Sequence, residues 1–559
     1  MNLLLLVLLP SVLAAPASPG SPTVTISAPS ATIVGQTGPK VESFNGIPFA
    51  QHPTGSLRLK PPQPLESPLG DIDATGIATS CPQFFFSTNN TEFPGSVVGE
   101  LANVPLFQKV TKAGEDCLSL NIRRPTGTKA DDKLPVLVWI FGGGFELGSS
   151  TMYDGAPLVT NSIDMDMPIV FVAINYRVGG FGFMPGAEIL ADGSANLGLL
   201  DQRRGLEWVA DNIEAFGGDP DKVTIWGESA GSISVFDQMM LHDGDIEYNG
   251  SPLFRGAIMN SGSIVPADPV DGDKGQAVYD AVVAHGGCES AKDTLECLRG
   301  LEYTDFLNAA NSVPGILSYH SVALSYLPRP DGTVLTQSPE LAVQQGKYAS
   351  VPFIVGDQED EGTIFALFQS NITTTDQLVD YLKEYFFFHA SIDQLNALID
   401  TYPDTVEDGS PFRTGTSNNW YPQFKRLAAI LGDLTFTLTR RLFLDYALTA
   451  KPDVPAWSYL ASYDHGTPIL GTFHGSDLLQ VFYGILPNYA SRSIHSHYLS
   501  FVYDLDPNQR SGKEFPNWPA WVEEKQLMQF FDDRGDLLKD EFRNDTYAFL
   551  VENVDSFRI

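Results

Sequence analysis

Basic residues are scarce in this sequence of 559 residues: 34 Lys and Arg stand against 68 Asp and Glu, a formal net charge of −34. Recognition of nucleic-acid phosphates needs a basic surface, so this balance excludes a nucleic-acid-binding protein. No uninterrupted apolar run approaches the roughly 20 residues that a membrane-spanning helix needs. We therefore expect no integral membrane anchor, and the net charge favours solubility.

The N-terminus lacks basic side chains, and the first is Lys40. Residues 3–9 are an apolar run that Pro10 interrupts, and small residues follow as far as Ala15. This pattern is typical of a secretory signal peptide, with a positive charge supplied only by the α-amino group. We predict a signal peptide over 1–15, a secreted mature chain over 16–559, and a buried N-terminal helix as the alternative.

Cysteine is also rare, with four residues in the whole chain. No pair has the short spacing of zinc ligands, and we expect no metal and no organic cofactor. An even number of cysteines in a secreted chain predicts two disulfides with three connectivities, of which the sequential pairing Cys81–Cys117 and Cys288–Cys297 is the simplest. Four sequons predict glycosylation sites at Asn89, Asn249, Asn371 and Asn544, and Pro252 disfavours Asn249.

Short apolar runs alternate with helical patterns over more than 300 residues, without repeats or low-complexity segments. Residues 16–40 are rich in Pro, Ser and Thr and indicate an extended N-terminal segment. A helix is expected over 202–216, ended by the Gly-Gly-Asp-Pro sequence at 217–220. Buried strands are expected at 135–141, 168–175, 223–226, 255–259, 351–355 and 456–460. This alternation predicts an α/β fold around a mostly parallel sheet covered by helices.

The sequence Gly-Glu-Ser-Ala-Gly at 227–231 matches the G-x-S-x-G turn of serine hydrolases. A predicted strand precedes it and a helical pattern from Ser232 follows it, which is the context that this turn requires. A Cβ atom on either flanking glycine would clash with the backbone, and Ser229 would stand at a helix N-terminus. A serine N-cap between two glycines is the structural alternative.

A second glycine-rich segment, Phe-Gly-Gly-Gly-Phe at 141–145, directly follows a predicted strand. Its backbone N–H groups can approach a substrate oxygen closely, as the oxyanion hole of an ester hydrolase requires. We expect donors at Gly143, Gly144 and Ala230, each worth about 3 kcal/mol in the transition state. A flexible turn is the alternative.

These motifs resemble the carboxylesterase/cholinesterase family. The resemblance includes Glu-Asp-Cys-Leu-Ser-Leu-Asn at 115–121 and Asn-Leu-Gly-Leu-Leu-Asp-Gln at 196–202. Leu-Pro-Arg-Pro-Asp-Gly at 327–332 and Gly-Thr-Phe-His at 471–474 are similar to the fungal lipases and sterol esterases of the Candida rugosa type. The resemblance runs from about residue 40 to the end and implies one large α/β-hydrolase domain over 16–559.

The family order of a nucleophilic serine, an acid and a histidine implies roles that the residues alone leave open. Asp357, Glu359, Asp360 and Glu361 all follow one predicted strand, and His465 and His474 follow another. The resemblance selects Glu361 and His474 as partners of Ser229. We interpret the other three carboxylates as solvated loop charges and His465 as a surface residue.

Apolar residues crowd the segment between Cys81 and Cys117, and Val97, Leu101 and Val104 have helical spacing. A core helix is one interpretation. The resemblance implies that 81–117 is a lid whose apolar face meets lipid, and association of two copies through their lids stays open. The resemblance also implies an acyl tunnel lined by Val265, Pro266, Ile316, Leu317, Ile364 and Phe365.

The sequence therefore predicts a secreted serine esterase of long-chain esters, both steryl esters and acylglycerols, acting at a lipid–water interface. A carboxylesterase for short soluble esters is the alternative, and a non-catalytic adhesion or binding protein on the same fold is a remote one.

Overall fold

The computed structural model describes residues 20–85, 112–482 and 487–559. The predicted signal peptide, the apolar lid helix and Asn89 lie outside these ranges. Within them, no helix has both the length and the apolar character that crossing a membrane would require.

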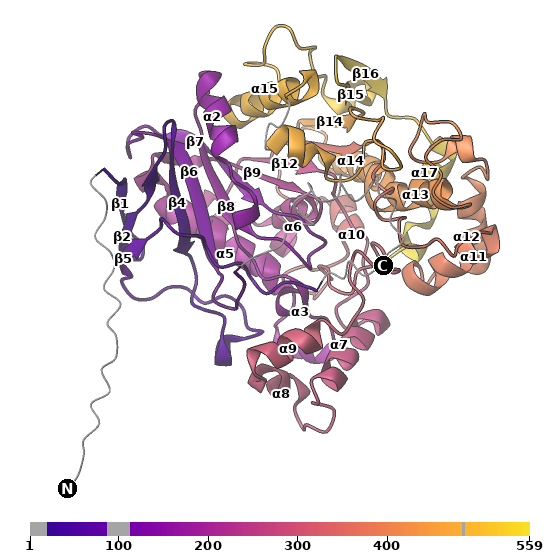
Figure 1. Cartoon of the computed structure of the whole chain (residues 1–559), viewed down its shortest axis with the longest axis horizontal. Coiled ribbons are helices and arrows are strands. Elements are labelled where there is room, and N and C mark those ends of the chain that lie inside the picture. Colours follow the sequence, from indigo (N-terminus) through magenta and orange to yellow (C-terminus); the bar gives the residue numbers. More distant parts are fainter. Residues whose placement is uncertain (1–19, 86–111, 483–486) are drawn as a thin grey trace.

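An eleven-stranded sheet runs through the molecule in the order β16-β15-β14-β13-β12-β9-β7-β8-β6-β4-β3 (Figure 1). Seven neighbouring strands are mutually parallel, and antiparallel strands extend the sheet at both ends. The parallel strands are β7 (Leu134–Ile140), β8 (Val170–Ile174), β9 (Gly218–Glu228), β12 (Gly256–Asn260), β13 (Phe353–Gln358), β14 (Ala456–Ala461) and β15 (Gln526–Phe530). The outer strands are β3 (Gln36–Thr37), β4 (Val41–Pro48), β6 (Ser119–Pro125) and β16 (Gly535–Lys539). The predicted α/β class is confirmed.

Helices cover the sheet, which explains why strands such as β7 and β8 consist entirely of apolar residues. Helix α6 (Ala230–Gly244) packs on β7, β9 and β12, and α15 (Tyr489–Asp504) packs on β7 and β9. Helix α2 (Ala156–Asp164) packs on β4 and β6, and α14 (Leu438–Ala450) packs on β13. Figure 1 shows α2 and α15 above β7 and β9, and α6 below these two strands.

Two predicted segments differ from the structure. The helix expected over 202–216 is the α-helix α5 (Leu197–Asn212) followed by a 3-10 helix (Ile213–Phe216), which ends at Gly217, whose φ of 85° suits only glycine well. The strand expected over 223–226 begins earlier, because β9 starts at Gly218. A register shift between Leu134 and Val136 of β7 accommodates the Gly-Asp-Pro sequence in the strand. The expected extended segment at 16–40 contains a hairpin of β1 (Thr23–Ser27) and β2 (Ser30–Val34), because Val24, Ile26 and Ile33 alternate into the core.

Candidate active site

Ser229 occupies the turn between β9 and α6, with φ 58° and ψ −127°. A residue with a side chain is strained in this region, and such strain is typical of a nucleophile exposed at a strand-to-helix turn. The Ser229 N–H donates to the Asn260 carbonyl at 2.9 Å, which fixes the turn to the neighbouring strand β12.

The glycines beside Ser229 have no room for a side chain, as the sequence predicted. A Cβ at Gly227 would lie 2.3 Å from the Gly231 carbonyl oxygen, and one at Gly231 would lie 2.0 Å from that of Ile140. Both obstacles are backbone atoms, which cannot rotate away as a side chain would.

We therefore expect Gly231→Ala to lower the free energy of unfolding by about 3 kcal/mol, the upper end of overpacking effects. Chemical denaturation of the purified variant measures this loss. Gly466→Ala is the matched control, because a Cβ there meets no atom within 4 Å. Equal stability of the two variants would contradict the argument.

His474 bridges Ser229 and Glu361. Its Nε2 lies 2.8 Å from the Ser229 Oγ and its Nδ1 lies 2.5 Å from Glu361 Oε2. Glu361 follows β13, His474 follows β14, and the Gln358 N–H donates to the second carboxylate oxygen of Glu361 at 2.7 Å. All three side chains are buried. A serine, a base that can take its proton and a carboxylate that orients the base are thus in hydrogen-bonding contact.

The other carboxylates near Glu361 are not the solvated loop charges that the sequence suggested. Asp357 is fully buried in an ion pair with Arg440, at 2.8 Å. Glu359 pairs with Arg413. These basic partners lie more than 50 residues away in sequence. His465 is exposed, as predicted.

Asp360 joins the two loops that carry Glu361 and His474. It is buried, its Oδ2 accepts from the Thr472 N–H at 3.0 Å, and its own N–H donates to the Thr472 carbonyl at 2.9 Å. Its other carboxylate oxygen accepts from Ser410 and from the Phe412 N–H. Burial raises the pKa of Asp360 to about 7. Its role in the fold is to hold the acid and the base at one separation.

Two further acids surround His474. Glu228 Oε1 lies 3.4 Å from His474 Nε2, and Asp477 accepts from Asn260 at 2.8 Å. Burial raises the pKa of Glu228 to about 8 and that of Asp477 to about 6. Burial alone would lower the pKa of His474, but the charge and hydrogen bond of Glu361 outweigh it and the pKa is raised. The imidazolium formed when His474 accepts a proton is therefore stabilised.

The predicted oxyanion donors lie beside Ser229. Gly143 and Gly144 have φ values of 119° and 63°, which point successive amides in directions that other residues rarely reach. Among the described residues, no backbone carbonyl accepts from either amide. Ala230 is the first residue of α6, so its N–H has no acceptor within the helix. Both glycines line one cavity with Ser229 and His474.

This cavity continues into a mostly apolar one that shares Gly144, Ser229, Ile316 and Phe365 with it. Val265 also lines the apolar cavity, and Pro266 lines a further cavity beside it. Four of the six predicted tunnel residues are thus brought together.

Leu317 and Ile364, the remaining two, are buried in the adjacent hydrophobic cluster and line none of these three cavities. Each is the chain neighbour of a lining residue, and neighbouring side chains outside a regular helix point in different directions.

Sequence reasoning missed several residues of the site. Asp237 and Phe436 line the apolar cavity, and the Phe436 ring centroid lies 4.5 Å from that of His474. Phe436 belongs to a π-helical segment, Asp433–Thr437, which has no sequence signal. The signal that could have identified Asp237 was its spacing: it lies eight positions after Ser229 and four after Ile233, on the same face of the helix.

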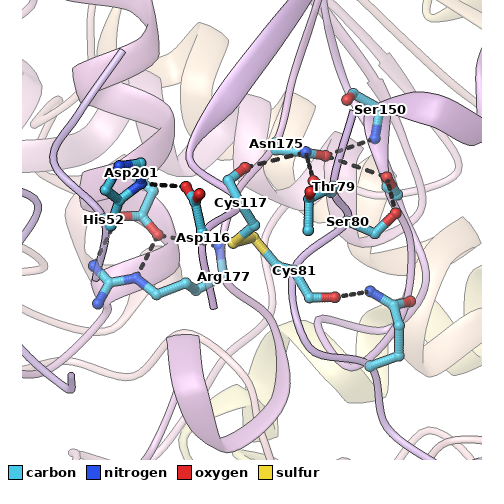
Figure 2. Close-up of a disulfide and its surroundings, with 12 residues drawn as sticks. His52, Thr79, Ser80, Cys81, Asp116, Cys117, Ser150, Asn175, Arg177 and Asp201 are labelled. Atoms are coloured by element: carbon cyan, nitrogen blue, oxygen red, sulfur yellow. Dashed lines mark hydrogen bonds and ion pairs between the residues drawn. A yellow bond between two sulfur atoms is a disulfide. The ribbon is translucent and has the colours of Figure 1, made fainter. Parts of the chain in front are cut away.

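The base of the predicted lid is fixed by more than a disulfide (Figure 2). Cys81 bonds to Cys117, and Asn175 donates both to the Cys117 carbonyl at 3.1 Å and to the Thr79 carbonyl at 2.9 Å. The Ser80 N–H donates to the Lys112 carbonyl at 2.9 Å. The two ends of the loop are therefore held together by backbone pairing as well as by the covalent bond.

The second disulfide joins Cys288 and Cys297, so the structure has the sequential pairing. Asn249, Asn371 and Asn544 are exposed, and their glycosylation stays a prediction. Across the three described ranges, no cluster of three or more His, Cys, Asp or Glu side chains is arranged to hold a metal ion.

Comparisons with known proteins agree with this geometry. A family model described as "Carboxylesterase family" matches residues 21–550. Secreted lipase 1 of Botryotinia fuckeliana (strain B05.10) is 64% identical over 540 residues, which are 96% of this chain and 94% of that protein. Lipase 4 of Diutina rugosa is 46% identical over 542 residues, 96% of this chain and 97% of that protein. The crystal structure of Aspergillus niger EstA matches with a TM-score of 0.79 and 27% identity, covering 96% of this chain and 99% of that one.

Proposed function

Because this chain belongs to the carboxylesterase family, we propose that it is a secreted lipase that hydrolyses long-chain esters through an acyl-enzyme on Ser229. The observation that supports this proposal most directly is the hydrogen-bonding contact of Ser229, His474 and Glu361 beside an apolar cavity. The family predicted from the sequence is confirmed, and so is the α/β-hydrolase fold, since structural neighbours such as EstA are carboxylesterases.

The proposed reaction has two halves. His474 Nε2 takes the Ser229 proton while the Oγ attacks the ester carbonyl, and the amides of Gly143, Gly144 and Ala230 stabilise the oxyanion. The imidazolium, stabilised by Glu361, returns its proton to the departing alcohol. Water then attacks the acyl-enzyme by the same route and releases the fatty acid and Ser229.

The long-chain preference is argued from the cavity. Its lining is apolar at Ile233, Val265, Ile316 and Phe365, and each buried methylene group contributes about 0.8 kcal/mol to binding. Relatives named as secreted lipases support both secretion and lipid substrates.

The domain and lid predictions belong to the same proposal: a signal peptide over 1–15, one hydrolase domain over 16–559, and a lid over 81–117. Phe85, at the start of the lid, is 55% exposed. An apolar side chain in this position would meet a lipid surface or the lid of a second copy.

We expect kcat/KM on emulsified trioleoylglycerol to exceed kcat/KM on the soluble butyrate esters, tributyrin and p-nitrophenyl butyrate, by at least about tenfold. The reason is that longer acyl chains bury more methylene groups in the cavity. The rate on cholesteryl oleate, emulsified in the same way, compared with the rate on trioleoylglycerol shows whether the protein prefers steryl esters or acylglycerols. Val265→Phe, which narrows the cavity, is expected to lower hydrolysis of the long-chain esters selectively. A preference for the soluble butyrate would instead indicate a short-ester carboxylesterase.

A further inference from the structure

Asp237 is an acidic side chain on the wall of the apolar cavity. Ser229, Ile233 and Asp237 are spaced by four residues along the N-terminal part of α6 and all line that cavity. This spacing places them on one face of the helix, so the cavity follows the helix from the nucleophile. Among the described residues that line this cavity, Asp237 has the only acidic side chain.

The Asp237 carboxyl group is buried without a partner. Its side chain is 1% exposed, and its Oδ2 has no hydrogen-bond partner among the described residues. Two other buried side chains of α6 do donate hydrogen bonds: the Ser232 hydroxyl donates to the Gly262 carbonyl at 2.6 Å, and the Gln238 amide nitrogen donates to the Leu199 carbonyl at 2.9 Å. A buried carboxyl group without a partner carries a free-energy cost that a ligand able to hydrogen-bond would remove.

The surroundings of Asp237 favour a neutral ligand group over a charged one as its hydrogen-bond partner. The cavity lining also includes Leu327, Pro328 and Pro339, and the two prolines have no N–H to donate. Burial raises the pKa of Asp237 well above its ordinary value, and no neighbouring charge opposes the shift. A protonated carboxyl group is one donor and one acceptor, which is the pattern that an alcohol hydroxyl complements.

Resting on the proposed lipase function, we propose that Asp237 determines specificity for acyl chains that carry a hydroxyl group near their middle. Eight residues of helix advance about 12 Å from Ser229. An extended alkyl chain advances roughly 1.3 Å per bond when each bond is about 1.5 Å long. Asp237 would therefore meet roughly the ninth or tenth carbon of an acyl chain whose ester carbonyl lies at Ser229.

The test compares two methyl esters of octadecanoic acid, one unsubstituted and one hydroxylated at about the tenth carbon. We expect the wild-type protein to favour the hydroxylated ester in kcat/KM by about tenfold, and Asp237→Leu to abolish that preference. Asp237→Asn, which keeps both a donor and an acceptor, is expected to retain part of it. The ratio of the two esters cancels any general loss of activity.

Asp243→Asn is the matched control. This exposed aspartate lies at the other end of α6, pairs with Lys347 at 3.2 Å, and lines none of the cavities described above. Its ester ratio is expected to equal that of the wild type. Thermal melting tests whether Asp237→Leu is folded, and we expect a raised Tm because an unpaired buried carboxyl group is removed.

Two outcomes separate this inference from the lipase proposal. Hydrolysis of both esters with the same ratio in the wild type and in Asp237→Leu would overturn the role of Asp237 alone. Hydrolysis of neither ester by the wild type would overturn both proposals. If Asp237→Leu does not fold, an unchanged ratio in Asp237→Asn together with a wild-type ratio near one overturns the inference.

Discussion

Replacing Ser229 by alanine is expected to lower kcat/KM on any ester by about 10⁶-fold, the loss seen when a nucleophilic serine is removed from such an arrangement. The variant lacks the Oγ that His474 Nε2 contacts at 2.8 Å, so no acyl-enzyme can form. The strained turn and its glycines remain, and we expect the Tm to stay within a few degrees of the wild type. Hydrolysis of p-nitrophenyl butyrate, followed at high protein concentration, measures the residual rate.

An exposed serine provides the control for this substitution. Ser27 lies at the end of β1, in a small sheet outside the main one, and Ser27→Ala should keep full activity. Activity of Ser229→Ala above about one thousandth of the wild-type value, in protein free of contaminating esterase, would rule out the acyl-enzyme mechanism.

Glu361→Gln should have the second largest effect, a decrease in kcat of about 10⁴-fold. Glutamine keeps the shape of the side chain, but its amide can donate to His474 Nδ1 and so favour the wrong tautomer of the imidazole. It also removes the negative charge that stabilises the imidazolium. Steady-state kinetics on a soluble ester, together with the pH profile of kcat/KM, measures both effects.

The pH profile distinguishes an electrostatic role from a structural one. Burial lowers the pKa of His474, but the charge of Glu361 outweighs burial and raises that pKa above its ordinary value. The kcat/KM of the wild type should therefore rise with pH as His474 loses its proton. Without the Glu361 charge, that rising limb should move to lower pH. Glu359→Gln is the control, since Glu359 pairs with Arg413 and not with His474. Equal losses in the two variants would contradict the assignment.

The sequence predicted the parts of the site that local motifs encode. Gly227 and Gly231 mark the turn because backbone atoms about 2 Å from their missing Cβ atoms leave no other choice. Strand–helix alternation likewise predicted the parallel sheet. His474 and Glu361 could be selected only through the family resemblance, since other candidates follow the same strands.

Long-range pairing explains the features that sequence reasoning predicted wrongly. Asp357 is buried because Arg440, 83 residues away, neutralises it. Asp360 is buried because Ser410 and the backbone of two other segments satisfy it. No local pattern around these acids indicates such partners. The direction of a side chain outside regular structure is equally nonlocal, so the sequence did not indicate that Asp237 lines the apolar cavity or that Leu317 lines none of the three cavities described.

The double attachment at the base of the predicted lid has an evolutionary consequence. Asn175 and the pairing of Ser80 with Lys112 hold the two ends of the loop at the sheet whatever lies between them. The entropic cost of closing a flexible loop grows by only about 0.6 kcal/mol for each doubling of its length. The intervening residues can therefore be lengthened, shortened or exchanged for those of a relative at little cost to the hydrolase beneath. If the segment 81–117 is the lid that we propose, it is a replaceable module, through which selection can retune the substrate range while the chemistry stays constant.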